Sequence, residues 1–447
     1  MAKDKEKPDK LLISDSNVND NIVPEGSATG TEVGLTVLGT LKNAKGPITY
    51  SLTNSASGAF AIDPSTGVVK VANGALLDYE VAQSHTITVS ATDGKTTASQ
   101  SFQIGVQNVL DIYGTGGGPT DVHIADLNGD GKMDFVASTG AGASVSLGNG
   151  NGTFQASTQY PAAAGDDVVI ADFNGDGHLD LAASQQSNGG QVAVLLGVGD
   201  GTFLFGGSYA AGSGSNGLAA GDLNNDQKAD VVVANEHGGV IVLLGNGDGT
   251  LNSGTTYAAG SVPNEVELAD LNGDGDLDIA ASNLFGNSIS ILIGNGDGTF
   301  QTHVDYAAGA RSSNLAIGDL NGDGVADVVS IDQDADTVSI LLNNGDGTFQ
   351  PRTAYTVGDF PSSASIGDVN GDGVADLAVT NQGSNNISVL LGNGDGTFNL
   401  HETHASGMLP WESDLGDLNG DGKLDLLVAA YGSNGVAVFL NQYDFMV

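Results

Sequence analysis

Seven copies of the nine-residue pattern D-x-N-x-D-x-x-x-D supply most of the potential chemistry of this 447-residue chain. The first copy runs from Asp126 to Asp134 and the last from Asp417 to Asp425. Successive copies begin about 49 residues apart, as expected for stacked repeats. Side-chain oxygens at positions 1, 3, 5 and 9 and the backbone carbonyl of position 7 are hard donors in a flexible ring, which suits Ca²⁺ better than Mg²⁺ or a softer metal. The pattern therefore predicts one calcium-binding loop in each repeat.

All seven loops offer the same ligand positions. Glycines at positions 4 and 6 allow the tight curl that brings the oxygens together, except in the third copy, where Asn225 and Gln227 replace them and weaker binding is expected. The predicted calcium ligands are Asp126, Asn128, Asp130, Lys132, Asp134, Asp172, Asn174, Asp176, His178, Asp180, Asp222, Asn224, Asp226, Lys228, Asp230, Asp270, Asn272, Asp274, Asp276, Asp278, Asp319, Asn321, Asp323, Val325, Asp327, Asp368, Asn370, Asp372, Val374, Asp376, Asp417, Asn419, Asp421, Lys423 and Asp425.

The carboxylates of one loop repel one another. Two of them about 4 Å apart repel by about 4 kcal/mol at an effective dielectric near 20, so the loops need a cation to close. The pattern matches the first half of an EF-hand, but position 12 of the first copy is Ala137, where that motif requires a bidentate Glu. The loops are therefore not EF-hands.

Short apolar segments must position each loop. In the second repeat, residues 168–171 precede the loop, residues 179–183 and 192–196 follow it, and an edge segment runs from Thr202 towards Tyr209. These lengths and compositions are typical of β-strands. Four strands in each of seven repeats predict an all-β fold, a seven-bladed β-propeller.

A second repeated motif, G-N-G-D-G-T-F or a near variant, separates the third and fourth strands. Asp-Gly and Asn-Gly pairs favour the positive φ angles of tight hairpins, so its acidic residues are interpreted as turn formers rather than metal ligands. The phenylalanine that follows is expected to pack between neighbouring blades. The turn residues are Asn151, Asp200, Asp248, Asp297, Asp346 and Asp395, and the phenylalanines are Phe154, Phe203, Phe300, Phe349 and Phe398.

The seventh repeat lacks this turn and its fourth strand, because only residues 441–447 follow the apolar segment 436–440. The segment 111–119 resembles the Tyr-Ala-Ala-Gly-x-x-Pro segment at residues 257–263. We expect residues 111–119 to complete the last blade and to close the ring, which removes exposed sheet edges.

Together, the loops, the turns and the Tyr-Ala-Ala-Gly-x-x-Pro segments resemble the FG-GAP or VCBS repeats of bacterial surface and secreted proteins, which are similar to the integrin α-subunit propeller. The resemblance implies a secreted or cell-surface propeller, made rigid by Ca²⁺, that acts in adhesion or ligand recognition. A protein or glycan ligand is expected at rim loops such as 185–190, 213–217 and 283–287. The propeller domain is expected to span residues 111–447.

Residues 17–110 follow a different pattern. Apolar and polar residues alternate around Tyr50, Val89 and Ile104, which predicts the half-buried strands of a β-sandwich. Several motifs, including Pro24-Glu25, Leu77-Asp78-Tyr79-Glu80 and Ala91-Thr92-Asp93-Gly94, resemble a cadherin repeat. That resemblance implies calcium ligands at Glu25, Asp78, Glu80 and Asp93; the alternative is that Asp78 and Glu80 only cap strands. Residues 1–16 are expected to form a polar tail.

The amino-acid composition argues against several classes of function. The net charge is −41, with 13 Lys and Arg against 54 Asp and Glu, which opposes binding to nucleic acids or anionic lipids. A hydrophobic content of 40% argues against a disordered acidic chain. Cysteine is absent, so disulfides and thiol chemistry are excluded. Neither a signal peptide nor a membrane-spanning segment is recognised, so export is expected by another route, or the chain is a fragment.

Catalytic motifs are weak. The pair His401 and His404 has a spacing that points the two rings to opposite faces of a strand, and no nucleophile elbow or phosphate loop is found. We therefore expect a non-enzymatic protein; the alternative is an exported polysaccharide-active lyase or hydrolase on the same scaffold. Trp411 and Tyr431 could stack on a sugar, although packing of Trp411 at the rim of the last blade is the favoured interpretation.

Overall fold

The computed structural model describes residues 10–17, 21–24, 27, 29–42, 44, 46–77, 84–107, 110–185 and 189–441. In this part of the chain the regular structure is β-strand with short 3₁₀ turns and no α-helix. The chain divides into two units, residues 1–109 and 110–447, which are described separately. The 3₁₀ turns include η1 (Gly74–Leu76), η2 (Pro161–Ala163), η4 (Gln333–Ala335) and η5 (Tyr431–Ser433).

The first unit is a sandwich of two four-stranded sheets, with strand orders β1-β3-β6-β5 and β2-β8-β7-β4. Alternate residues of β7, among them Ile87, Val89 and Ala91, are fully buried between the sheets, as the sequence pattern predicted. The strands are β1 (Leu12–Asp15), β2 (Ile22–Pro24), β3 (Glu32–Thr40), β4 (Thr49–Asn54), β5 (Phe60–Ile62), β6 (Val68–Val71), β7 (Ser84–Thr92) and β8 (Thr97–Gln107).

The start of the sandwich differs from the sequence prediction, which assigned residues 1–16 to a polar tail. Leu12–Asp15 form β1 and pair antiparallel with β3, from Leu12 opposite Thr40 to Asp15 opposite Val37. Leu11 and Ile13 are buried in the core of the sandwich, whereas Leu12 is exposed. The tail assignment is wrong for these residues because a run of three apolar residues was too short to reveal an alternating strand.

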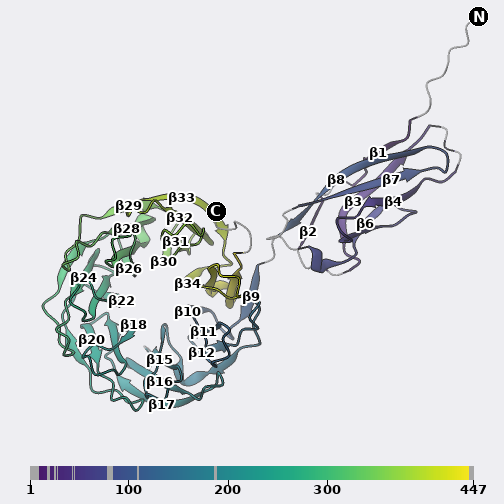
Figure 1. The fold of residues 1–447 in the computed structure, drawn as a ribbon. Helices are drawn as coiled ribbons and strands as arrows, with labels where there is room; N and C mark the ends of the chain where they lie inside the picture. Colours follow the sequence, from purple (N-terminus) through teal and green to yellow (C-terminus); the bar gives the residue numbers. More distant parts are fainter. Residues whose placement is uncertain are drawn as a thin grey trace, which may run out of the picture. The chain divides into compact units, whose positions relative to one another are not determined.

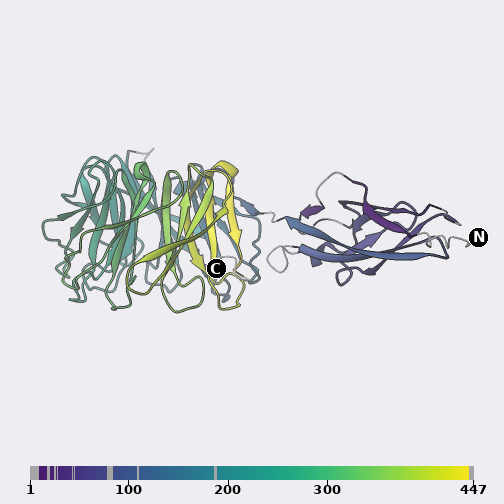
Figure 2. The same cartoon turned by 90° about the horizontal axis from the view of Figure 1, so that it is seen from above.

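The second unit is a ring of seven four-stranded antiparallel sheets, the blades, with the first strand of each repeat innermost (Figure 1). Seen from the side, the strands run between the two faces of the ring (Figure 2). Blade 1 is β10 (Pro119–Ala125), β11 (Asp134–Thr139), β12 (Gly142–Ser146) and β13 (Thr158–Tyr160); blade 2 is β14 (Val168–Ala171), β15 (Asp180–Gln185), β16 (Gln191–Gly197) and β17 (Phe203–Ala210); blade 3 is β18 (Ser215–Gly221), β19 (Asp230–Asn235), β20 (Gly239–Leu243) and β21 (Thr255–Tyr257). Blade 4 is β22 (Pro263–Ala269), β23 (Asp278–Asn283), β24 (Ser288–Leu292) and β25 (Val304–Ala307); blade 5 is β26 (Ser312–Gly318), β27 (Asp327–Asp332), β28 (Thr337–Leu341) and β29 (Thr353–Thr356); blade 6 is β30 (Pro361–Gly367), β31 (Asp376–Asn381), β32 (Asn386–Gly392) and β33 (Phe398–Ala405).

Blade 7 joins the two ends of the unit. Its strands are β34 (Pro410–Gly416), β35 (Asp425–Ala430), β36 (Gly435–Phe439) and β9 (Asp111–Gly114), and β36 pairs with β9 from Gly435 opposite Gly114 to Val438 opposite Asp111. Segment 111–119 therefore spans two blades, because Pro119 already begins β10 of blade 1. The predicted closure of the ring is confirmed, because a strand from the start of the unit completes the last blade.

The core of the ring lies between blades rather than within them. Val136 and Val145 of blade 1 pack against Leu181 and Leu195 of blade 2, and an equivalent cluster joins blade 1 to blade 7. The five phenylalanines that follow turns are buried in these clusters, as predicted, and each meets a tyrosine of the preceding blade edge-on, with centroids 5.3 Å apart for Tyr257 and Phe300. These contacts hold neighbouring blades in register.

Candidate functional site

Each predicted calcium loop joins the first strand of a blade to its second. The strands are antiparallel, so these loops and the repeated third-to-fourth-strand turns lie on one face of the ring, and the other connections lie on the opposite face. The turns also touch the loops of their own blade. A β-carbon at Gly296 would meet the carboxylate of Asp276, and the φ angle of +68° at this position favours glycine.

Position 9 of the pattern has a structural role that the sequence did not reveal. In loop 4, Asp278 is fully buried, and its two oxygens accept the backbone N–H groups of Leu271, at 2.9 Å, and Gly294, at 2.7 Å. Burial raises the pKa of Asp278 to about 6, although these two hydrogen bonds lower it. The equivalent buried aspartates, which make the same two bonds, are Asp134, Asp180, Asp230, Asp327, Asp376 and Asp425.

The side chains at positions 1, 3 and 5 accept backbone N–H groups of the same loop, and the backbone therefore curls around them. Asp270 accepts the N–H groups of Gly273, at 2.7 Å, and Gly275, at 2.8 Å, while Asn272 accepts that of Asp274 at 2.8 Å. Gly273 and Gly275 have φ angles of +77° and +90°. Their left-handed backbone allows this curl, as the sequence predicted.

The donor set of each loop fits Ca²⁺, because it contains carboxylate, amide and carbonyl oxygens and no softer ligand. The described aspartates of a loop do not, however, bring one oxygen each within 4.8 Å of one another, whereas ligands of one Ca²⁺ lie at most about 5 Å apart. Binding of Ca²⁺ would therefore draw the carboxylate of position 1 and the exposed carboxylate of position 5 towards the buried carboxylate of position 9. The ion would supply the positive charge that offsets their repulsion.

Loop 3, which lacks both glycines, keeps the same backbone shape. Asn225 and Gln227 take up φ angles of +60° and +63°, and Asp222 still accepts the N–H groups of Asp226 and Gln227. The amide of Asn225 also donates to Asp276 of blade 4 at 2.8 Å. Weaker calcium binding by this loop stays a prediction.

The acidic residues of the repeated turns form the turn itself, in agreement with the interpretation from sequence. Asp297 accepts both the backbone N–H of Thr299, at 3.0 Å, and its hydroxyl, at 2.5 Å. These bonds lower the pKa of Asp297. Asp200, Asp248, Asp346 and Asp395 make the same pair of bonds.

A cavity of about 650 Å³ lies among the inner strands, and the sequence reasoning missed it. Its only sequence signal is the presence of charged residues at alternate positions of the inner strands β10, β22 and β34, five and three residues before the loops. Two basic residues, His123 and Arg311, line the cavity together with many acidic residues. The acidic residues of its wall are Asp121, Asp166, Asp167, Glu236, Glu265, Glu267, Glu412 and Asp414.

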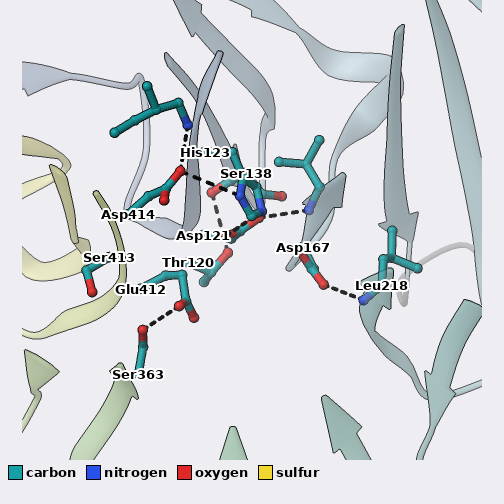
Figure 3. Close-up of polar contacts among 12 residues, drawn as sticks. Thr120, Asp121, His123, Ser138, Asp167, Leu218, Ser363, Glu412, Ser413 and Asp414 are labelled. Atoms are coloured by element: carbon teal, nitrogen blue, oxygen red, sulfur yellow. Dashed lines mark hydrogen bonds and ion pairs between the residues drawn. The ribbon is translucent and has the colours of Figure 1, made fainter. Parts of the chain in front are cut away.

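Three of these carboxylates tie adjacent blades together (Figure 3). Asp121 of blade 1 accepts the N–H of Val168 at 2.9 Å, and Asp167, just before β14, accepts that of Leu218 in blade 3 at 2.5 Å. Asp414 of blade 7 accepts the N–H of Ile124 in blade 1 at 2.8 Å. Part of the acidic wall is therefore structural.

Burial and neighbouring charges strongly shift the pKa values of two other cavity residues, Glu412 and His123. Desolvation raises the pKa of Glu412 to about 8, with a further contribution from the charge of Asp121. Burial alone would lower the pKa of His123, but Asp121, Asp414 and Glu412 outweigh it and raise that pKa to about 10. The imidazole therefore carries a positive charge at neutral pH when no other cation is near.

Glu412 gives a testable pH dependence. Its pKa is raised by folding, so its contribution to stability is complete below about pH 4.5 and is lost as the pH rises through about 8. Chemical unfolding of the wild type in excess Ca²⁺ should show stability falling over this range, and Glu412→Gln should be about 3 kcal/mol more stable relative to wild type at pH 8 than at pH 5. Equal pH slopes for the two proteins would contradict this assignment.

Exposed apolar side chains lie on the same face as the cavity mouth. Trp411 lines the cavity, is 40% exposed, and stacks on Tyr431 with ring centroids 5.8 Å apart. Phe285, in the predicted rim loop 283–287, is 66% exposed, and its neighbour Leu284 lines the cavity. Trp411 therefore packs against the last blade, in agreement with the favoured interpretation from sequence, and also keeps part of its surface exposed.

The predicted ligands of the sandwich are only partly described. Asp93 accepts the N–H groups of Lys95, at 2.9 Å, and Thr96, at 2.7 Å, and so forms a turn. Glu25, Asp78 and Glu80 lie outside the described residues. Within the described part of the chain, no helix has the length and hydropathy that a membrane span requires.

Comparison with solved structures identifies the fold of the second unit. BBS1N, in complex with ARL6DN, aligns with a TM-score of 0.54 and 14% identity over 76% of this chain and 98% of that chain. A streptogramin B lyase aligns with a TM-score of 0.50 and 15% identity over 74% of this chain and 97% of that chain. At such low identity the similarity concerns the fold alone.

Sequence comparison identifies the families. A cadherin domain model matches residues 21–107, and human cadherin-related family member 2 is 35% identical over 119 residues, which are 26% of this chain and 9% of that protein. The FG-GAP-like repeat model matches residues 126–183, 172–233, 222–281, 270–330, 319–379 and 368–428, so the matches begin at six of the seven loops and together cover more than half of the chain. The chain belongs to the FG-GAP-like repeat family and carries an N-terminal cadherin domain.

Proposed function

We propose that this protein is a calcium-binding adhesion or ligand-recognition protein that acts outside the cell and is not an enzyme. The observation that carries the proposal is the repetition of one oxygen-donor loop in all seven blades, each built on a buried aspartate that also anchors the blade. A loop that is repeated in every blade is suited to stabilising the scaffold, whereas a catalytic centre needs a single set of residues. The N-terminal cadherin domain of the same chain supports a role in adhesion.

The face opposite the calcium loops is the proposed ligand-binding surface. It carries the cavity mouth, the stacked pair Trp411 and Tyr431, and exposed Phe285. Exposed aromatic side chains in a polar surround are the usual anchors of protein and glycan ligands. Loss of calcium would loosen the blades that present them.

Arrays of glycans and extracellular proteins, probed with the whole chain in Ca²⁺ and again in EDTA, test this function. We expect binding that requires Ca²⁺ and that Trp411→Ala weakens at least about tenfold, the usual effect of losing an aromatic anchor. The matched control is Leu204→Ala, which alters an exposed residue of β17 and should leave binding unchanged. Binding that is unchanged by EDTA and by Trp411→Ala would contradict the proposal.

The enzymatic alternative is tested separately. Incubation with anionic polysaccharides, followed by the ultraviolet absorbance of unsaturated products and by reducing-end assays, should show no turnover. Sustained turnover that is lost on substituting a cavity carboxylate such as Glu267 would replace the proposal with a lyase or hydrolase.

A further inference from the structure

One group of side chains in the cavity has the composition of a metal site different from the calcium loops. Asp121, His123 and Asp167 each place one ligand atom within 4.8 Å of the other two, and no other three acidic or histidine residues of the described chain do so. Asp121 and His123 are alternate residues of β10 and so share a face, while Asp167 comes from blade 2 (Figure 3). Asp121 and Asp167 are 5% and 9% exposed.

The orientation of all three side chains is fixed by the surrounding blades. The backbone N–H of Val168 donates to an oxygen of Asp121, and that of Leu218 donates to an oxygen of Asp167. The Nδ1 of His123 lies 4.0 Å from an oxygen of Asp414, and its Nε2 faces Asp121. A histidine that binds a metal through one nitrogen commonly presents the other to a carboxylate, and such outer contacts set the ring orientation.

The distances suit a small tetrahedral ion. Ligand atoms at about 2.0–2.2 Å from Zn²⁺ lie about 3.3–3.6 Å from one another in a tetrahedron. The Nε2 of His123 and the nearer oxygen of Asp121 are 3.4 Å apart. One imidazole nitrogen with two carboxylate oxygens favours Zn²⁺ or a similar transition metal over Ca²⁺, whose ligands are oxygens alone.

We propose that the central cavity binds one divalent transition-metal ion of the Zn²⁺ type through Asp121, His123 and Asp167, with its fourth position open to the cavity. The excess of carboxylates in the wall favours a dication electrostatically. In the competing arrangement, a protonated His123 pairs with Asp121 and no metal binds. This site is independent of the calcium loops and of the proposed function.

The test uses the whole chain in excess Ca²⁺, so that the loops are saturated. Zn²⁺ is titrated by calorimetry, and Co²⁺ is titrated with its visible absorption as a report of tetrahedral coordination. We expect one Zn²⁺ per chain that Ca²⁺ does not displace. His123→Ala should weaken this binding at least about 100-fold, since one of only three protein ligands is lost.

Two further variants separate ligation from folding. Asp167→Asn keeps an oxygen that can accept the N–H of Leu218 but loses the ligand charge, and it should weaken Zn²⁺ binding while leaving the melting curve in Ca²⁺ near that of wild type. His237→Ala is the matched control, because His237 is exposed between β19 and β20, and it should bind Zn²⁺ normally. No calcium-resistant Zn²⁺ binding, or binding that survives in both His123→Ala and Asp167→Asn, would overturn the proposal.

Discussion

Removing calcium will lower the melting temperature of the propeller by about 20 °C. With a Kd of about 0.1 mM for each loop, about 1 mM Ca²⁺ stabilises the fold by about 1.4 kcal/mol per loop, and seven loops together contribute about 10 kcal/mol. Each kcal/mol shifts the melting temperature by about 2 °C in a unit of this size. Differential scanning calorimetry in Ca²⁺ and in EDTA measures the difference.

The physical reason is that seven groups of like charges lie in one closed ring. In each loop two exposed or half-exposed carboxylates face a buried one, as Asp319 and Asp323 face Asp327, and their charges further raise the pKa of the buried group. Mg²⁺ at the same concentration is the control, and it should restore little of the lost stability because it gives up its water reluctantly. Equal restoration by Mg²⁺ would point to general screening of charge rather than to calcium cages.

Asp327→Ala is expected to have the largest effect of any single substitution in a loop. It leaves the buried N–H groups of Leu320 and Asn343 without their acceptor, and each such loss costs about 1–3 kcal/mol. The variant should therefore be destabilised by about 3–5 kcal/mol in urea unfolding, in EDTA as well as in Ca²⁺, since the hydrogen bonds do not depend on the ion.

Two other aspartates of blade 5 are matched controls for that substitution. Asp323→Ala removes an exposed ligand whose partner N–H, on Val325, remains open to water, so it should cost about 1 kcal/mol in Ca²⁺ and almost nothing in EDTA. Asp346→Ala changes only the exposed turn and should cost less than about 1 kcal/mol in both conditions. If Asp327→Ala behaved like Asp323→Ala in EDTA, the anchoring role of position 9 would be wrong.

The features that the sequence predicted are local. Each loop, each turn and each short strand is specified within a few residues of itself, and sevenfold repetition made the blade recognisable. The pairing of β9 with β36 followed from counting strands, because the last repeat was one strand short. The burial of Phe300 between blades followed from its position just beyond its turn, whereas its contact with Tyr257 was not predicted.

Most features that the sequence missed depend on contacts between residues that are distant in the chain. Asp121 and Asp167 are 46 residues apart and meet only because neighbouring inner strands converge on one cavity. The second hydrogen bond of Asp278 comes from Gly294, beyond the next strand, so the anchoring role of position 9 cannot be read from the loop alone. The short strand β1 was missed for the opposite reason, since three apolar residues give too little pattern.

The most direct test of the central claim is the number of calcium ions bound to the folded chain. Equilibrium dialysis against about 1 mM Ca²⁺, with elemental analysis of both compartments, should give about seven Ca²⁺ or more bound per chain, one for each loop, and EDTA should remove them together with much of the thermal stability. A well-folded sample that contains no calcium and has the same unfolding curve in EDTA would contradict the account.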